Sequence, residues 1–250
     1  MQTVLNLFQF KANFVMTTKP ETITKKISRS LRAPFDKSKS VKRLDEYLST
    51  KRTLEETVDW ALDFNGGGGL YRVKTLQKKS EILSLAKMVQ DLNPTNILEI
   101  GTERGGTLFI WAAIASQKAI SCDLQQMDFQ REFYAKFPPA GSDCKIRLLV
   151  GDSHCEELVQ LVENELDGEL IDFLFIDGDH SEVGVAQDFE MYNQFVRKGG
   201  LIAFHDIVEN QPLEMNQVQY FWGKIKNNYE HYEFIDNVAQ CGYGIGVIRI

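Results

Sequence analysis

Two aspartates and two histidines in the second half of the chain are the residues best suited to chemistry. Asp177 and His180 follow one short apolar run, and His205 and Asp206 follow the next. If both runs are neighbouring parallel strands, their carboxyl ends border the same crevice. Carboxylates beside imidazoles can move protons or hold a divalent cation, so these four residues predict a reaction centre.

A hydroxyl is a poor nucleophile at neutral pH, and it needs either a base or a metal ion that lowers its pKa. His180 is the candidate base, with Asp177 beside it, and Asp177 and Asp206 are the leading metal ligands. His205 is a third candidate ligand, although Mg²⁺ prefers oxygen. Three alternatives stay open: a softer ion such as Mn²⁺, a supporting role for His205, or no metal. Each histidine can also be a hydrogen-bonded residue at a strand end or turn.

A second group of candidates lies in a glycine-rich turn. Asn96–Thr107 reads as a buried strand, an acid near its end, the turn and a helix start. Glycines there let the backbone approach a ligand at the carboxyl edge of a sheet. The turn is not GxGxxG and lacks the lysine of a phosphate loop, so a dinucleotide site is the weaker option. The candidate cofactor-binding residues of this segment are Glu99, Gly101, Thr102, Gly105, Gly106 and Thr107.

Acidic residues follow the next two predicted strands. Asp123 stands about 20 residues after the turn, where an acid suits the ribose hydroxyls of a nucleoside. Asp152 and Ser153 follow a third strand and suit an adenine edge. Any one of them is as readily a turn residue. Together, at successive strand ends on one edge, they indicate a nucleoside site.

The elements that would position these residues alternate between strand and helix from about residue 92 onward. Nearly continuous apolar runs bounded by polar or glycine residues predict a doubly wound, mostly parallel sheet covered on both faces. Two final runs, 230–236 and 242–250, have no helix between them and should pair antiparallel. Asp188 is expected on a solvated helix face or as a cap partner. The expected strands are 96–100, 119–122, 146–150, 171–176 and 201–204, and the expected helices are 107–116, 127–136, 156–165 and 184–196.

The part before residue 75 is expected to be an extension, with the main domain over 75–250. Residues 1–50 have a basic bias and little periodicity, and are expected to be partly disordered. Helical spacing appears over 44–62 and again over 75–92. Between them, Gly66–Gly69 and the Tyr71–Thr75 segment suggest a lid over the cofactor.

Bulk properties narrow the classes of protein. The 250 residues carry a net charge of −7, which argues against general nucleic-acid binding. The four cysteines have no CxxC spacing, and no apolar run approaches the about 20 residues that span a bilayer. The expectation is a cytoplasmic protein that acts on a small hydroxylated molecule, without membrane or nucleic-acid partners, and with a homo-oligomer left open.

Three segments resemble the class I S-adenosylmethionine-dependent methyltransferases, nearest the branch of macrocin-type O-methyltransferases and cephalosporin-hydroxylase-like proteins. They are LEIGTERGGTL (98–108), LVGDS (149–153) and DFLFIDGDH with the stretch that follows it (172–207). The resemblance implies a seven-stranded sheet with its last strand antiparallel. It also implies that the Gly101 loop holds the methionine part, Asp123 the ribose, and Asp152 with Ser153 the adenine.

In metal-dependent members of that family, an aspartate after the fourth strand and an acidic pair after the fifth hold magnesium. A histidine three residues after the first aspartate serves as base. Asp177, His180 and Asp206 match this pattern, whereas His205 replaces the first acid of the pair. The predicted function is S-adenosylmethionine-dependent O-methylation of a sugar or natural product, with Mg²⁺ or Mn²⁺ as a possible aid. The alternative is a non-catalytic nucleoside-binding protein, and an oxidoreductase is a weaker third.

Overall fold

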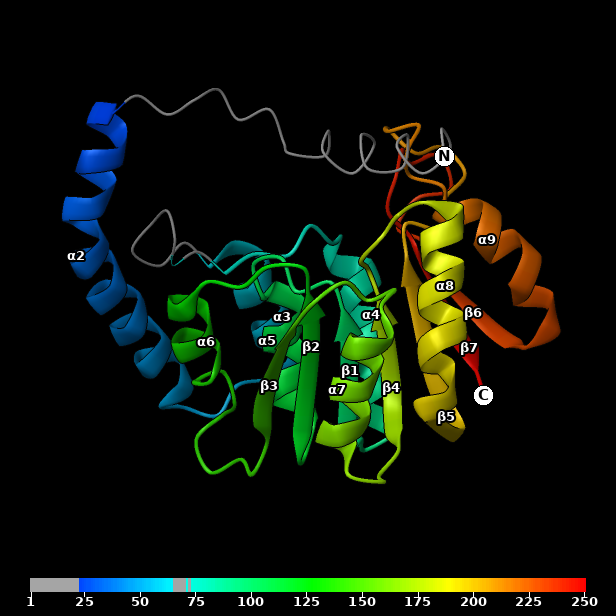
Figure 1. Cartoon of the computed structure of the whole chain (residues 1–250), viewed down its shortest axis with the longest axis horizontal. Helices are drawn as coiled ribbons and strands as arrows, with labels where there is room; N and C mark the ends of the chain where they lie inside the picture. The colour runs from blue at the N-terminus through cyan, green and yellow to red at the C-terminus, as the bar shows by residue number, and fades with distance from the viewer. Residues whose placement is uncertain (1–22, 65–70, 72) are drawn as a thin grey trace, which may run out of the picture.

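A seven-stranded sheet in the order β3-β2-β1-β4-β5-β7-β6 lies at the centre of the molecule (Figure 1). The computed structural model describes residues 23–64, 71 and 73–250. Strands β1 to β5 run parallel, and β7 lies antiparallel between β5 and β6. The predicted fold class is therefore confirmed. The strands are β1 (Asn96–Ile100), β2 (Lys118–Asp123), β3 (Lys145–Val150), β4 (Ile171–Ile176), β5 (Val196–His205), β6 (Glu230–Phe234) and β7 (Ile245–Arg249).

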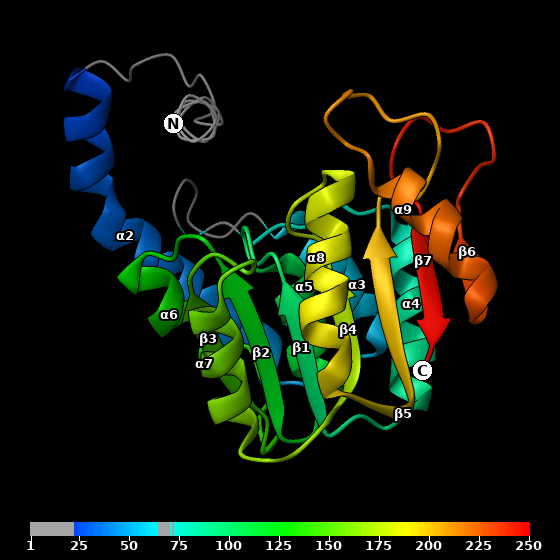
Figure 2. The same ribbon diagram turned by 45° about the vertical axis from the view of Figure 1, so that its right-hand side comes forward.

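Helices cover both faces of this sheet (Figure 2). On one face, α3, α4 and α5 bury a cluster that includes Trp111 and Phe173, and on the other, α7, α8 and α9 bury a cluster that includes Tyr192 and Phe204. These two layers explain why β1 and β4 are buried at every position. The helices are α2 (Ile23–Leu48), α3 (Leu54–Asp63), α4 (Lys79–Asp91), α5 (Gly106–Ile114), α6 (Asp128–Tyr134), α7 (Glu156–Leu166), α8 (Glu182–Tyr192) and α9 (Val218–Ile225).

The N-terminal part is more helical than the sequence suggested. Helix α2 begins at Ile23, well before the expected start near residue 44, and it contains Pro34. Helix α3 opens with a capping box in which the Thr53 hydroxyl accepts from the amide of Glu56, whose carboxylate accepts from the amide of Thr53. Trp60 of α3 then stacks on Phe109 of α5 at 4.1 Å between ring centroids. Part of the predicted extension thus packs on the main sheet.

The predicted lid falls partly outside the described residues, because Gly66–Gly69 are not among them. Tyr71 and Val73 are buried, and the Tyr71 ring packs against Phe129 at 4.9 Å. A bridge between Lys74 and Gly105 places this segment beside the glycine turn. Tyr71, Val73 and Lys74 are thus packed next to the turn, and a lid over the cofactor stays a prediction.

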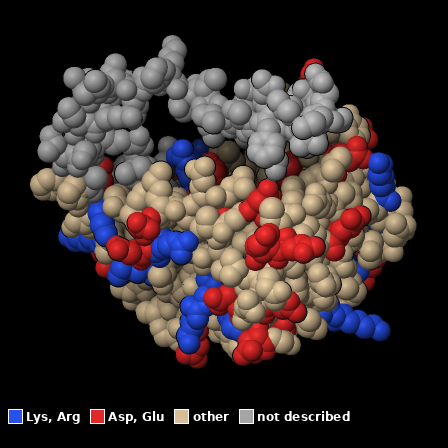
Figure 3. Space-filling view, in the orientation of Figure 1, with Lys and Arg blue, Asp and Glu red and all other residues tan. Residues whose placement is uncertain are grey.

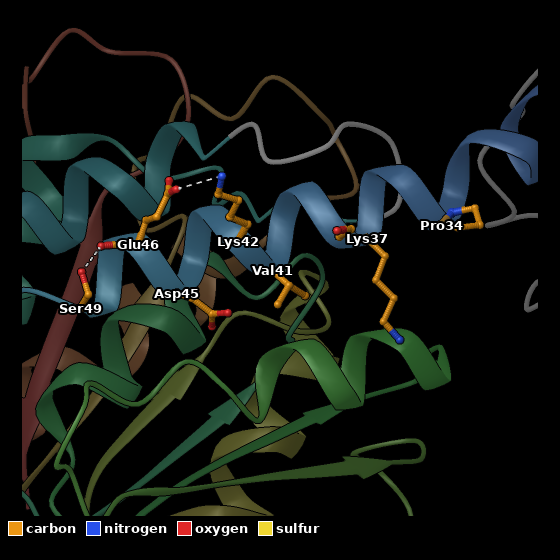
Figure 4. Close-up of a pocket in the computed structure, with 8 residues that line it drawn as sticks. Pro34, Lys37, Val41, Lys42, Asp45, Glu46 and Ser49 are labelled. Atoms are coloured by element: carbon orange, nitrogen blue, oxygen red, sulfur yellow. Dashed lines mark hydrogen bonds and ion pairs between the residues drawn. The ribbon is translucent and has the colours of Figure 1, made fainter.

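The surface carries charges of both signs. On the face drawn in Figure 3, acidic side chains lie over α7 and α8, and basic ones lie nearer α2 and α6. A hollow along α2 is lined by Lys37, Val41 and Asp45, and Lys37 reaches Glu132 of α6 at 2.5 Å (Figure 4). None of the predicted site residues lines this hollow. Within the described part of the chain, no helix is long and apolar enough to cross a membrane.

The carboxyl ends of β1 and β4 approach each other very closely. The amide of Asp177 donates to the carbonyl of Ile100 at 2.9 Å, directly before Gly101. Gly101 has φ +98°, and a Cβ built there would lie 2.2 Å from the carbonyl oxygen of Asp177. Only glycine tolerates both the left-handed backbone and this contact.

We therefore expect Gly101→Ala to lower the free energy of unfolding by about 2–4 kcal/mol, from backbone strain plus displacement of Asp177. Gly141→Ala is the matched control, because Gly141 also has positive φ but nothing within 4 Å of its missing Cβ. The control should lose only about 1 kcal/mol. Equal losses for both variants in urea denaturation would show that the close approach is unimportant.

Candidate active site

The glycine turn after β1 is fixed by the strand ends beside it. The Gly101 amide donates to the carbonyl of Cys122 at 2.8 Å. The amides of Thr102 and Glu103 both donate to one carboxylate oxygen of Asp123, at 3.0 and 2.8 Å. Gly105, with φ +68°, is the N-cap residue of α5. Asp123 thus lies at the predicted edge and anchors the turn, a role that the sequence did not suggest.

Glu99 lies beneath the turn instead of facing a ligand. Its side chain has no exposed surface and accepts from Ser121 at 2.6 Å and from the Trp111 indole at 3.1 Å. A side chain without accessible surface cannot touch a cofactor while the protein keeps this conformation. The prediction of a direct cofactor contact by Glu99 is therefore corrected to a supporting role. Burial raises the pKa of Glu99 to about 7.

The other residues of the turn are also largely covered. Thr102 is 3 % exposed and its hydroxyl lies 2.6 Å from that of Ser121. Gly106 lies against the backbone of Lys74, and Thr107 is 5 % exposed. Their predicted contacts to a cofactor would come from backbone atoms of the turn, and they stay predictions.

The segment after β3 reaches the same edge. Asp152 accepts from the amide of His154 at 3.0 Å, and the carbonyl of Ser153 accepts from the hydroxyl of Tyr192 at 2.9 Å. Both side chains are partly exposed. Their place beside Asp123, across the β2–β3 pair, agrees with the predicted nucleoside edge.

Asp177 is the centre of the second half of the site. One of its oxygens, Oδ1, accepts from two imidazoles, at 3.2 Å from His180 Nε2 and at 3.1 Å from His205 Nδ1. The other oxygen accepts from the Gln77 amide at 3.0 Å. The predicted convergence of residues from β4 and β5 is therefore present, with a glutamine added from the segment before α4.

Asp206 completes this group from the end of β5. One of its oxygens accepts from the Asn216 amide at 2.5 Å, and the other accepts from the backbone of Tyr243 at 3.1 Å. His180 Nδ1 lies 3.7 Å from Asp206, and His205 Nδ1 lies 3.5 Å from it. Asp206 has φ +66°, a strained conformation that these contacts hold in place.

Charge pairing sets the protonation of this cluster. Burial alone would raise the pKa of Asp177, but the charge of His205 and hydrogen bonds from His180 and His205 hold it well below its usual range. Burial would lower the pKa of His205, but Asp177 and Asp206 raise it to about 9. Burial would lower the pKa of His180, but its hydrogen bond to Asp177 together with the charges of Asp177 and Asp206 raises it. His205 therefore carries a positive charge at neutral pH.

The same contacts bear on the predicted metal site at Asp177, His205 and Asp206. All four carboxylate oxygens already accept hydrogen bonds from the protein, and the imidazolium of His205 offsets part of their charge. Among the residues that the structure describes, no group of three His, Cys, Asp or Glu side chains is arranged to hold a metal ion. In this arrangement the residues do not fit a divalent cation, and the metal stays a sequence-based prediction.

Several residues of the site were missed from sequence. Gln77, Asn216 and Tyr243 come from segments without a regular pattern, and only the tertiary fold brings them to Asp177 and Asp206. Asp188 was expected on a solvated helix face or as a cap partner, yet it is fully buried. Helix α8 has a weak amphipathic pattern, with apolar residues on more than one side, and this pattern could have indicated that Asp188 is buried.

The comparisons with known proteins agree with this geometry. Residues 98–207, a little under half of the chain, match the model of a family described as a methyltransferase domain. An uncharacterized protein of Acanthamoeba polyphaga mimivirus is 32% identical over 114 residues. That match covers 44% of this chain and spans only half the length of the viral protein.

Two solved structures have the same fold. An O-methyltransferase from Bacillus cereus, in complex with S-adenosylhomocysteine, has a TM-score of 0.54 and 20% identity, covering 84% of this chain and 96% of its own. The O-methyltransferase TomG from Streptomyces achromogenes, in complex with S-adenosylmethionine, has a TM-score of 0.56 and 13% identity, covering 83% and 96%. The family match confirms the predicted resemblance to methyltransferases, and the two solved structures show that the fold is the same.

If the carboxylates are saturated as described, millimolar Mg²⁺ or Mn²⁺ should leave the Tm within about 1 °C of its value in EDTA. Differential scanning fluorimetry measures this directly. A metal-dependent rise of several degrees that Asp206→Asn abolishes, and that the exposed-site control Asp167→Asn keeps, would reinstate the predicted metal site.

Proposed function

We propose that this chain is an S-adenosylmethionine-dependent O-methyltransferase with a class I methyltransferase domain. Its acceptor is proposed to be a hydroxyl of a small molecule such as a sugar or natural product. The observation that carries the proposal is the His180–Asp177 pair, because it places a partly exposed imidazole beside the glycine turn at the carboxyl edge.

The residues at the edge fit the proposed cofactor. Gly101 packs directly against the backbone of Asp177, which places the glycine turn beside the His180–Asp177 pair at the carboxyl edge, where a sheet of this kind binds its ligand. Oδ1 of Asp123 accepts one amide, that of Gln125 at 3.0 Å, and is proposed to accept a ribose hydroxyl as well. Asp152 with Ser153 is proposed to supply polar groups for an adenine. S-adenosylmethionine, when bound, supplies a methyl group on a sulfonium, which leaves as a neutral thioether.

The protein's part in the reaction is to orient the acceptor and take its proton. With the Nε2–H of His180 directed at Asp177 by a contact of 3.2 Å, the other nitrogen, Nδ1, is left to accept the hydroxyl proton. The acceptor oxygen forms its new bond to the methyl carbon as the carbon–sulfur bond breaks and its electron pair goes to sulfur. Asp177 and Asp206 then stabilise the imidazolium of His180.

His205 is proposed to neutralise Asp177 and Asp206 where metal-dependent members of this family bind a cation. Its side chain is only 6 % exposed and lies between both carboxylates. Its positive charge can therefore offset theirs, and its ring can keep the two carboxylates in place. Metal assistance is therefore not part of this proposal. The alternative of a non-catalytic nucleoside binder has the same fold and differs in showing cofactor binding without turnover.

We expect micromolar binding of S-adenosylhomocysteine in isothermal titration, and at least a tenfold loss in Asp123→Ala. Because Asp123 also anchors the turn, Asp123→Asn should fall between the two, since it keeps one acceptor oxygen. Asp143→Ala, an exposed aspartate before β3, is the control and should bind as the unmodified chain does. Absence of binding by the unmodified chain would overturn the proposed function.

We expect His180→Gln to lower kcat by about a hundredfold to ten-thousandfold, the usual contribution of a general base. Its affinity for S-adenosylhomocysteine should stay within about twofold, because His180 is proposed to contact the acceptor. Formation of S-adenosylhomocysteine, followed over a panel of sugars and phenols, is the measurement. The control is His231→Gln, which changes an exposed histidine on β6. Unchanged kcat in the His180 variant would remove it from the mechanism.

A further inference from the structure

A buried charge lies beside the proposed nucleoside edge and takes no part in the mechanism above. Asp188, on the second turn of α8, has no exposed side-chain surface. Neither of its oxygens has a hydrogen bond of good geometry within the described residues. Its counter-ion is His154, whose Nε2 lies 3.2 Å from Oδ1 of Asp188. An isolated buried carboxylate is strongly unfavourable, so this pairing decides whether the arrangement is stable.

His154 belongs to the segment that follows β3, directly after Asp152 and Ser153. Two neighbours of Asp188 on α8 hold the same segment, since Tyr192 donates to the carbonyl of Ser153 at 2.9 Å and Gln187 donates to that of His154 at 3.4 Å. Helix α8 thus fixes this segment through one charged and two neutral contacts.

The charged contact also reaches the edge itself. His154 Nδ1 lies 3.8 Å from the carboxylate of Asp152, whose oxygen accepts the His154 amide at 3.0 Å. The imidazole therefore stands between a buried carboxylate below and a partly exposed one at the proposed adenine position. Moving or discharging His154 would disturb both Asp152 and Ser153.

We infer that the His154–Asp188 ion pair is the positioning element of the base-binding segment 152–155, and that cofactor affinity falls when His154 loses its proton. This inference rests on the proposed function, since it concerns the segment assigned to adenine. His154 and Asp188 are positioning residues, because they act through Asp152 and Ser153.

The charges around His154 fix the direction of the pH effect. The close approach of Asp188 raises the pKa of His154, burial opposes this, and the charges of Asp188, Asp152 and Asp179 add to the rise. The imidazolium therefore persists above the ordinary histidine range near 6.5. Below its raised pKa the pair is intact, and above it Asp188 is left without a counter-ion. Affinity should accordingly be highest at slightly acid to neutral pH and fall on the alkaline side.

The test is isothermal titration of the full chain with S-adenosylhomocysteine from pH 6 to 9. We expect Kd to rise about tenfold over this range in the unmodified chain. His154→Gln should bind weakly at every pH, with a flat profile. His154→Gln/Asp188→Asn should bind more tightly than His154→Gln alone, because the second change removes the unpaired buried charge. Glu190→Gln, on an exposed position of α8, is the charge-matched control and should keep the original profile.

A purely structural role would not produce this pattern. It would lower the Tm of His154→Gln without a pH-dependent Kd in the unmodified chain and without rescue by the added Asp188→Asn. In turnover, the inferred role raises KM for S-adenosylmethionine while kcat changes little. If the unmodified chain binds S-adenosylhomocysteine but His154→Gln keeps the same Kd and pH profile, the inference alone is overturned. If the unmodified chain binds at no pH, the proposed function fails, and the inference with it.

Discussion

The close approach of β1 to β4 at their carboxyl ends is the constraint on which the rest of the site depends. The backbone of Gly101 touches that of Asp177, which accepts hydrogen bonds from both imidazoles. The turn proposed to hold the cofactor and this aspartate are therefore held in a fixed relative position. In a methyl transfer the donor and acceptor must be aligned closely, and small displacements cost rate. A glycine with positive φ is thus a condition for the reaction geometry.

A second feature is the number of buried carboxylates along the same edge. Glu81, Glu99, Asp177 and Asp188 are all largely covered, and each has a different partner set. Glu81 accepts from Gln240 and from the backbone of Asp236 and Gly244, which joins α4 to the loop before β7. Asp177 and Asp188 are paired with histidines instead. The interactions of Asp177 and Asp188 with their histidines therefore depend on the protonation of those histidines, whereas the hydrogen bonds of Glu81 to amides do not.

The part of the site around Asp177 and Asp206, where the acceptor is proposed to bind, is built by segments far apart in the chain. Gln77 comes from the stretch before α4, Asn216 from the loop after β5, and Tyr243 from the loop before β7. Each uses one polar group to hold Asp177 or Asp206. Chain segments of this kind vary readily between proteins of one fold, whereas the strands beneath them do not. A strand edge that is common to the fold would support a reaction common to its members, and loops that differ between members would select the acceptor of each.

The sequence by itself determined the parallel sheet, its two helical layers and the meeting of Asp177, His180, His205 and Asp206. Strand periodicity and strand-end position are local properties, and the topology of a doubly wound sheet makes strand ends converge. Local pattern failed where burial depends on a partner. Glu99 looked like a cofactor contact and Asp188 like a solvated or capping residue, yet both are covered by neighbouring elements. The hydrogen bonds to the predicted metal ligands, and the ion pair behind the proposed nucleoside edge, were decided only by the tertiary structure, because residues distant in sequence supply them.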